Sequence, residues 1–568
     1  MGIATTHYLE RIVSSLGQGG HAQVKFEPNE GLCMAGVLFL LPALIAQGLL
    51  RTRDVYQLPA NHYYGLDAVV LTLSFMALAR IKNPEQLKQC KPGEIGRIIG
   101  LDRVPEVRCL RDKIKLLTGQ QKAKELNNLL VDQWYSGDSQ QDGAFLYIDG
   151  HVRIYYGSKA NLPTKFISRQ KLCLSATTEY WVNDAKGMPV MMVMGELTEK
   201  LQTAIEEYII PQMMQTSLLN SLQTLDCPDK PQCTFIFDRE AYEPAFFQRL
   251  WVVYRIAIIT YRKNVKDNWE EILFTSFGTK VLSQSVNTLL CEQKTELGGY
   301  SFREIRRLSE GGHQTAIITT HPTLNIADIA GRMFGRWSQE NFFRYLIADY
   351  DFDKMIEFGV ETIDLEKKVV NPQYRKVNHQ LKKQREKISR MEAKFYPLAE
   401  QAMEQNIDQL PEITQKQAQY KEDLDLLKQK QAELLEKRKQ FPPKITLKEM
   451  PEKVRYNKLK TESKLLINVV KMICYRAESA VASLLEPYLS RADDEKRMLV
   501  KQIIQNNADL IPNYENNTLT ITLHGLSTPR FNQAAHQLSK ILNETETLFP
   551  GTNLRMIFKT TADPFCEM

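Results

Sequence analysis

A charged stripe recurs every four residues in the segment 331–346. If this segment is helical, Arg332, Arg336, Glu340 and Arg344 lie on one side of the helix. Such a carboxylate can bind a divalent cation, and the flanking guanidinium groups can form bidentate hydrogen bonds with phosphates of a nearby polyanion. The same spacing also fits plain i,i+4 ion pairing on a solvated helix, which contributes a few tenths of a kcal/mol per pair. Other acidic residues must decide between the two interpretations.

Two further carboxylates lie upstream, each next to an apolar run. Asp149 and Gly150 interrupt the segment 145–157, and this pair predicts the turn of a β-hairpin, with His151 facing solvent. Asp238 directly follows Thr234–Phe237, which has the pattern of a buried strand. The other predicted elements are a strand at Met188–Met194, a helix at Thr198–Ser217, a helix at Ala245–Trp251 and a strand at Tyr254–Tyr261.

This order of elements resembles the RNase H-like α/β core of DDE transposases. The segment Arg336–Tyr345, RWSQENFFRY, resembles the third-acid segment of bacterial insertion-sequence transposases, and is similar to the group with a β-rich insert before the glutamate helix. In that group an Arg lies four residues before the Glu, as Arg336 does here. A Tyr and a Lys also expected in that group are replaced by Met333 and Ile347. The resemblance extends across most of Glu30–Lys559.

The resemblance implies a transposase that nicks DNA at transposon ends and then joins the freed 3′-OH to target DNA. It implies that Asp149, Asp238 and Glu340 are catalytic and bind two Mg²⁺ or Mn²⁺ ions. In such chemistry, two ions roughly 4 Å apart activate the attacking oxygen and stabilise the leaving oxygen. We expect the partners to be double-stranded DNA and a second copy of the chain, with Arg332, Arg336 and Arg344 contacting phosphates.

The N-terminal region, 1–135, is predicted to be helical. A short helix at Glu94–Ile99 ends at Gly100, and Pro105 begins a second helix with a basic outer face. The pair is similar to a helix-turn-helix unit, and the family resemblance implies that it binds transposon-end DNA. An ordinary solvated face is the alternative, because Glu106 and Asp112 dilute the charge. The residues expected to contact DNA are Arg108, Arg111 and Lys115.

Composition places the chain among soluble globular proteins without requiring any one partner. The 568 residues carry a net charge of +6, which permits a polyanionic partner. The nine cysteines contain no CxxC pair, so we expect free thiols in a reducing cytoplasm and a nucleoid-associated location. Gly31–Leu50 is an uncharged run interrupted by Pro42, and we interpret it as buried helix rather than a membrane segment.

Together these patterns predict a multidomain α+β protein. The catalytic core is expected at 140–263 and 315–360, split by a β-rich insert at 264–314. An antiparallel coiled-coil hairpin is predicted at 370–441 from its heptad seams, and a small α+β domain at 460–568.

Three alternatives remain open from the sequence. The first is a nuclease of the same fold that never joins ends. The second is an inactive or repurposed relative that binds DNA without cutting it. The third is a coiled-coil scaffold, which is favoured only if the three acids lie apart in space.

Overall fold

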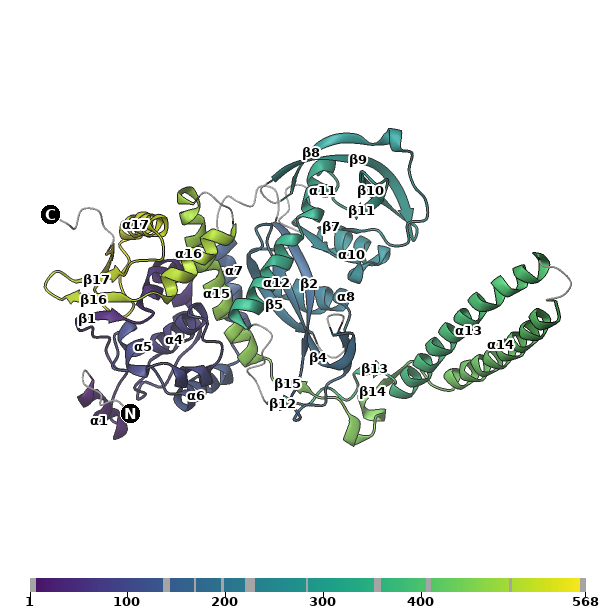
Figure 1. Ribbon diagram of the computed structural model, residues 1–568. Helices are drawn as coiled ribbons and strands as arrows, with labels where there is room; N and C mark the ends of the chain where they lie inside the picture. Colours follow the sequence, from purple (N-terminus) through teal and green to yellow (C-terminus); the bar gives the residue numbers. More distant parts are fainter. Residues whose placement is uncertain are drawn as a thin grey trace.

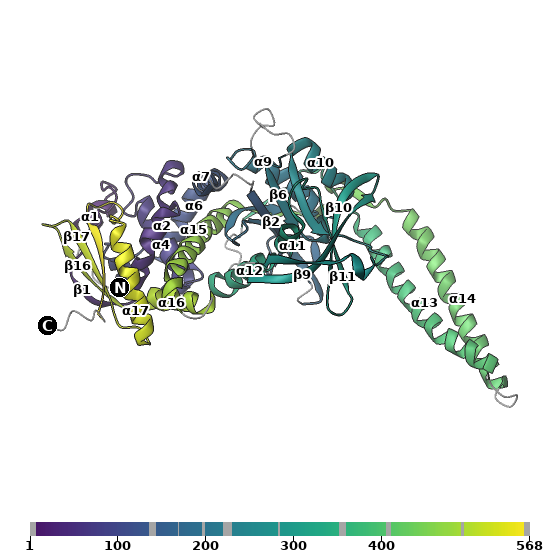
Figure 2. The same ribbon diagram turned by 90° about the horizontal axis from the view of Figure 1, so that it is seen from above.

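The computed structural model describes residues 7–135, 144–167, 170–195, 199–219, 230–281, 284–351, 359–404, 410–489 and 493–561. The molecule is elongated, with a helical body at one end, a large sheet in the centre and a two-helix arm at the other end (Figures 1 and 2). The predicted multidomain α+β class is confirmed, because helices and several separate sheets share the chain.

The central sheet has ten strands in the order β3-β4-β2-β6-β7-β11-β10-β9-β8, with β5 paired to β4. Strands β2, β6 and β7 run parallel, whereas β4 is antiparallel to both β2 and β5. Helices from the crossovers pack on one face of this sheet, and a helix that follows the insert packs on the opposite face. The first part comprises β2 (Ala144–Ile154), β3 (Thr164–Ile167), β4 (Leu172–Asn183), β5 (Pro189–Gly195), α8 (Leu201–Ala204), the π-helix η5 (Ile205–Ile209), α9 (Ile210–Met213), β6 (Cys233–Phe237), η7 (Arg239–Ala241), α10 (Pro244–Tyr254) and β7 (Ile256–Tyr261).

The predicted hairpin turn at Asp149-Gly150 is wrong. Strand β2 runs straight through both residues, and Asp149 pairs with Trp181 of β4, a strand that the sequence reading missed. His151 does not face solvent either: it is buried, and its ring stacks on Phe343 at 5.5 Å. Asp-Gly is a strong turn signal, but here tertiary pairing with β4 overrides it.

The insert is more β-rich than predicted and extends the same sheet rather than forming a separate one. Strand β11 pairs antiparallel with β7, so the insert continues the hydrogen-bonded ladder of the core. The helix α11 packs closely on strand β8: a Cβ added at Gly331 would lie 2.5 Å from the carbonyl oxygen of Lys280. The elements are η8 (Glu271–Leu273), β8 (Thr275–Val281), β9 (Gln284–Leu297), β10 (Tyr300–Leu308), β11 (Gln314–Thr319), α11 (Ile326–Phe334) and α12 (Trp337–Tyr350).

The two ends of the chain fold together into the helical body. One hydrophobic core contains residues from both 1–135 and 460–568, with the long helix α15 packed against α2, α4, α6 and α7. A four-stranded sheet, β1-β16-β17-β18, likewise joins an N-terminal strand to C-terminal ones. The elements are α1 (Tyr8–Ser15), β1 (Asn29–Leu32), η1 (Ala35–Leu40), α2 (Leu41–Ala46), η2 (Leu49–Arg51), α3 (Thr52–Val55), α4 (Leu66–Leu78), η3 (Pro84–Gln89), α5 (Pro92–Ile98), α6 (Val107–Gly119), α7 (Ala123–Tyr135), α15 (Glu462–Leu485), η12 (Glu486–Tyr488), α16 (Asp493–Gln505), β16 (Ala508–Asn513), β17 (Thr518–Leu523), α17 (Pro529–Glu544) and β18 (Arg555–Thr560).

The apolar run near the N-terminus lies inside this core. Among the described residues no single helix is long and apolar enough to span a membrane, although the bent pair Ala35–Ala46 and Leu49–Val55, at 64°, meets the same length and composition criteria. Side chains such as Leu38, Leu41 and Leu44 are fully buried by protein, as expected for a core segment.

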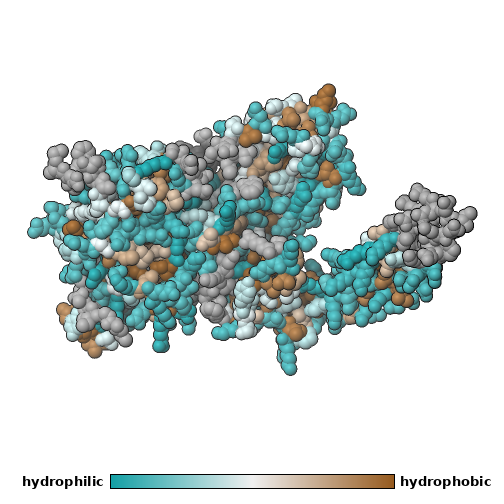
Figure 3. All heavy atoms as spheres, viewed as in Figure 1, coloured by the Kyte–Doolittle hydropathy of each residue, from teal (hydrophilic) through white to brown (hydrophobic). Residues whose placement is uncertain are grey.

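The arm consists of two long helices that pack on each other and project from the sheet (Figure 1). Val377, Leu381, Ile388 and Leu424 are buried between them, and the remaining surface is mostly hydrophilic (Figure 3). Short strand pairs join the arm to the core. The elements are β12 (Val360–Glu361), β13 (Lys368–Val370), α13 (Pro372–Glu404), α14 (Leu410–Lys439), β14 (Lys444–Thr446), η10 (Leu447–Glu449), η11 (Glu452–Val454) and β15 (Lys458–Leu459).

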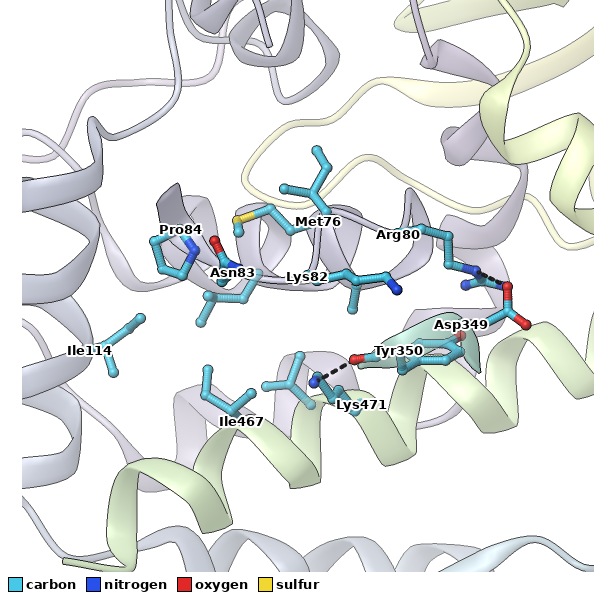
Figure 4. A pocket seen from close by; sticks show the side chains of 14 residues that line it. Met76, Arg80, Lys82, Asn83, Pro84, Ile114, Asp349, Tyr350, Ile467 and Lys471 are labelled. Atoms are coloured by element: carbon cyan, nitrogen blue, oxygen red, sulfur yellow. Dashed lines mark hydrogen bonds and ion pairs between the residues drawn. The ribbon is translucent and has the colours of Figure 1, made fainter. Parts of the chain in front are cut away.

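A small, mostly apolar pocket lies where α12 ends against the helical body (Figure 4). Lys471 of α15 points into it and donates a 2.7 Å hydrogen bond from Nζ to the backbone oxygen of Tyr350, the last residue of α12. A cation at a helix C-terminus is favourable. On the other side of the pocket, Arg80 pairs with Asp349 at 3.2 Å. Lys501 also pairs with Asp349, at 3.0 Å, so three cations of the helical body hold the end of α12.

We expect Lys471 to make the free energy of unfolding depend on pH in the alkaline range. Burial lowers the pKa of Lys471 to about 8 from an ordinary 10.5. Between these values an unfolded chain holds its proton while the folded protein has lost it, so stability rises with pH in this window, by at most about 3 kcal/mol. We expect the melting temperature of wild type minus that of Lys471→Met to increase between pH 7.5 and 9.5. A difference that stays constant would show that Lys471 is not the titrating group.

Candidate active site

Strand register places Asp149 beside Asp238. In the parallel pair β2 and β6, Tyr147 lies opposite Ile236, so two residues further on Asp149 reaches the level of Asp238. Asp238 directly follows β6, and its side chain accepts a 2.7 Å hydrogen bond from the backbone N–H of Arg239 at the start of η7. The Asp149 carboxylate accepts from Gly150 N–H at 2.9 Å. Both carboxylates therefore lie where the pairing between β2 and β6 ends.

Glu340 lies near this place, on the first turn of α12. The helix predicted across 331–346 is interrupted: α11 ends at Phe334 and α12 begins at Trp337. Gln339, almost fully buried, fixes the start of α12 to the sheet. Its amide nitrogen donates to the backbone oxygens of Tyr147 at 3.1 Å and Trp181 at 3.4 Å, and to the Asn183 side chain at 3.0 Å. The residue before Glu340 is therefore bonded to the strand that carries Asp149.

Arg336 lies between two of the acids. Its Nη2 is 3.9 Å from an Asp238 oxygen and 3.8 Å from a Glu340 oxygen. Burial raises the pKa of Asp149, and the negative charges of Asp238 and Glu340 raise it further, while the nearby Arg336 opposes both effects. The three predicted acids therefore interact with one another and with a single guanidinium group.

Sequence reasoning missed a fourth acid. Glu240 lies two residues beyond Asp238, and burial together with the charge of Asp149 raises its pKa. The signal was present in the sequence as an acid shortly after the strand end, but nothing in its spacing distinguished it from a turn residue. Gln339 gave no signal either, because its hydrogen bonds are entirely tertiary.

The other arginines of the predicted stripe do not join the acids. Arg332 stacks on the Phe145 ring, with its guanidinium carbon 3.3 Å from the ring centroid. Arg344 is exposed, one turn beyond Glu340, and makes no ion pair with any residue in the described part of the chain. Of the three arginines in the predicted stripe, only Arg336 therefore lies beside the acids, and Arg344 lies on the adjacent solvent-facing surface.

The basic outer face of α6 borders a cleft between α6, η3 and the start of α15. Arg108, Arg111 and Lys115 are all exposed, while Leu110, Ile114 and Leu117 on the opposite face of α6 are buried. Arg111 forms an ion pair with Glu85 of η3. In the lining of the cleft, basic side chains outnumber acidic ones.

The donor set suits hard divalent cations, which prefer carboxylate oxygens. Within the described ranges, however, no three acidic, His or Cys side chains stand close enough to surround one ion as they are placed. The position between Asp238 and Glu340 is taken by the Arg336 guanidinium, which supplies the positive charge there. Asp149, Asp238 and Glu340 therefore fit a cation site in chemistry and location, with Arg336 occupying part of it.

Gln339 provides a test of how α12 is positioned. Gln339→Leu keeps the size of the side chain but removes the donors to Tyr147 and Trp181, which should cost about 1–3 kcal/mol of stability. Because Glu340 is the next residue, we expect any reaction at these acids, assayed as DNA nicking in Mg²⁺, to fall at least about tenfold in the folded variant, whatever its residual stability. The matched control is Gln384→Leu, which removes a 2.9 Å bond from a buried Gln in the arm and should not affect nicking. Wild-type nicking by Gln339→Leu would contradict this role.

The fold and the site define a multidomain α+β protein in which Asp149 within β2, Asp238 directly after β6 and Glu340 at the start of α12 lie near one another. Comparison with known families makes the class specific. The model of a family described as "Transposase protein" matches residues 2–562, so the chain belongs to this transposase family. Membership implies an enzyme that cleaves and transfers DNA. No curated protein matches the sequence.

Proposed function

We propose that this transposase is of the DDE type, with an RNase H-like core and a metal-dependent reaction of nicking followed by strand transfer. The strand order β5-β4-β2-β6-β7 supports the RNase H-like core, because it joins an antiparallel trio to a parallel trio through β2. The positions of the acids also support this assignment. Asp149 lies on the first core strand, β2, Asp238 follows the fourth, β6, and Glu340 lies on the later helix α12.

One observation carries the proposal. The β2–β6 register and the Gln339 bonds bring Asp149, Asp238 and Glu340 to the same end of the β2–β6 pairing, although 89 residues separate the first two acids and 102 separate the last two in the numbering. Such convergence is not needed by a scaffold or by surface ion pairing. It is required for carboxylates that hold a cation pair, as Mg²⁺ or Mn²⁺.

In this proposal each group has a role that its surroundings allow. Asp149, Asp238 and Glu340 hold the cations, which when bound activate the attacking oxygen and stabilise the leaving oxygen. Arg336 binds a phosphate of the DNA backbone. Gln339 holds Glu340 in register with Asp149. A second copy of the chain brings the second transposon end.

The experiment uses two DNA substrates with Mg²⁺. The first is a duplex carrying the flanking DNA of the element, on which we expect nicks at the ends. The second is an end already cut to leave a 3′-OH, which we expect to join to a target plasmid. Nicking without joining would identify a nuclease of the same fold. Binding without either reaction would identify a DNA-binding relative that no longer cuts.

Arg108, Arg111 and Lys115 are proposed to contact DNA phosphates. Each phosphate contact contributes about one unit to the slope of log affinity against log salt, so the triple Ala variant should reduce the slope by about three. The charge-matched control replaces Lys382, Lys383 and Arg385, three exposed cations on α13. We expect this control to retain the wild-type slope in a gel-shift titration. Equal slopes for both triple variants and wild type would place end binding elsewhere.

A further inference from the structure

Arg336 is held beside the acids by charge and not by directional bonds. The same nitrogen, Nη2, lies 3.9 Å from Asp238 and 3.8 Å from Glu340, and both distances exceed those of a hydrogen bond. Its other terminal nitrogen, Nη1, is buried and has no hydrogen-bond partner among the described residues. The side chain is only 13% exposed. A buried guanidinium without full hydrogen bonding is costly, so this arrangement is easily exchanged for a better one.

Nη2 is a positive charge shared by two carboxylates. It is nearly equidistant from Asp238, which follows β6, and from Glu340 on α12. Without this charge, Asp149, Asp238 and Glu340 would repel one another with less compensation, whereas Glu240 is also attracted by Lys165 and Lys263. A divalent ion bound by both carboxylates would lie close to this guanidinium, and the two positive charges would repel each other. Binding of the ion therefore favours departure of Arg336.

We propose that Arg336 is the resident counter-cation of this site, and that it leaves when a divalent ion enters, transferring its guanidinium to a DNA phosphate. The proposal rests on the proposed function and adds to it a coupling between metal binding and DNA binding. A phosphate offers both terminal nitrogens of Arg336 the short charged hydrogen bonds that they lack here. DNA that draws Arg336 away thereby opens the site to metal.

The exchange makes metal and DNA binding cooperative. A ligand that favours the displaced position of Arg336 raises the affinity for any other ligand that needs the same position, and the coupling is reciprocal. The DNA-free protein therefore binds divalent ions weakly, and it becomes loaded mainly when DNA lies in the site. Such coupling restricts metal-loaded enzyme to the DNA complex.

The test measures Mn²⁺ binding to the DNA-free, full-length protein, from the electron paramagnetic resonance signal of free Mn²⁺. Removing the competing guanidinium in Arg336→Gln should tighten Mn²⁺ binding at least about tenfold, which corresponds to about 1.4 kcal/mol. Arg344→Gln is the matched control, because it removes the same charge from an exposed position one turn beyond Glu340. We expect its Mn²⁺ affinity to change less than about threefold, since solvent screens an exposed charge.

The second arm adds a 20-bp DNA duplex, with the Mn²⁺ bound by DNA alone subtracted. DNA should tighten Mn²⁺ binding to wild type and to Arg344→Gln, but not to Arg336→Gln, which has no guanidinium to displace. Arg336→Met serves as the second variant if Arg336→Gln fails to fold.

The outcomes separate this inference from the proposed function. Equal Mn²⁺ affinities in Arg336→Gln and Arg344→Gln, or weaker binding in Arg336→Gln, would overturn the counter-cation role. Asp238→Asn tests the site itself: it should weaken Mn²⁺ binding in either case. Unchanged binding in Asp238→Asn would overturn the proposed metal site, whatever Arg336 does.

Discussion

Glu340→Gln should lower the rate of DNA nicking by several orders of magnitude while leaving DNA binding intact. The substitution keeps side-chain size and helix propensity but removes the charge that would hold a cation. If divalent ions supply most of the barrier reduction, loss of one ligand disables the chemical step. Binding should survive or tighten slightly, because a negative charge beside the DNA is removed. A nicking assay in Mg²⁺ and a gel shift in Ca²⁺ measure the two effects separately.

The control for this result is Glu392→Gln, which breaks an ordinary surface ion pair with Lys428 at 3.3 Å in the arm. Such pairs contribute at most about 1 kcal/mol, so nicking should continue. Asp149→Asn and Asp238→Asn should each resemble Glu340→Gln, and the double variants should be no worse than the single ones, because residues that act as a unit are not additive. Near-wild-type nicking by Glu340→Gln would remove the basis for the DDE assignment.

Glu478→Ala should cause the largest loss of stability, about 3–5 kcal/mol. Glu478 is fully buried in α15 and accepts hydrogen bonds from Arg80 at 3.0 Å, from Tyr350 at 2.6 Å and from Tyr345. Both tyrosines belong to α12, so the carboxylate joins this helix to the helical body. Its removal leaves the Arg80 charge buried with less compensation, which costs more than the pair itself contributes.

Two variants show that charge burial causes the loss. Glu486→Ala breaks an exposed pair with Lys496 at 3.2 Å and should cost less than about 1 kcal/mol. The double variant Arg80→Met, Glu478→Leu replaces the buried charges by apolar side chains and should recover most of the stability lost in Glu478→Ala. Denaturant unfolding measures all four proteins. A double variant as unstable as Glu478→Ala would show that packing, and not charge, explains the loss.

Local patterns were enough to predict the elements that carry two of the acids. Asp238 follows an apolar run that does form strand β6, and Glu340 lies on a helix whose residues Phe342 and Leu346 are buried as the 3.6-residue period indicates. Asp149 was selected as a candidate from a predicted hairpin turn that does not form. Its strand continues through Gly150 because β4 pairs with it, and β4 lacks the alternation of a half-buried strand.

What the sequence did not reveal depends on contacts between distant segments. Arg332 appeared to belong to the charged stripe, but α11 and α12 are separate helices and Arg332 stacks on Phe145. The terminal regions were predicted as separate units, yet β1 pairs with β16 across the two ends of the chain. The bonds of Gln339 and the position of Arg336 likewise exist only once the sheet and α12 have packed together.

Iron-directed cleavage tests most directly whether the three carboxylates form one cation site. Fe²⁺ bound in place of Mg²⁺, with ascorbate and peroxide, produces hydroxyl radicals that cut the polypeptide next to the ion. We expect fragments that end near Asp149, Asp238 and Glu340, suppressed by excess Mg²⁺ and absent from Asp238→Asn. Cuts confined to other segments, or cuts at these three positions that persist in Asp238→Asn, would contradict a shared site.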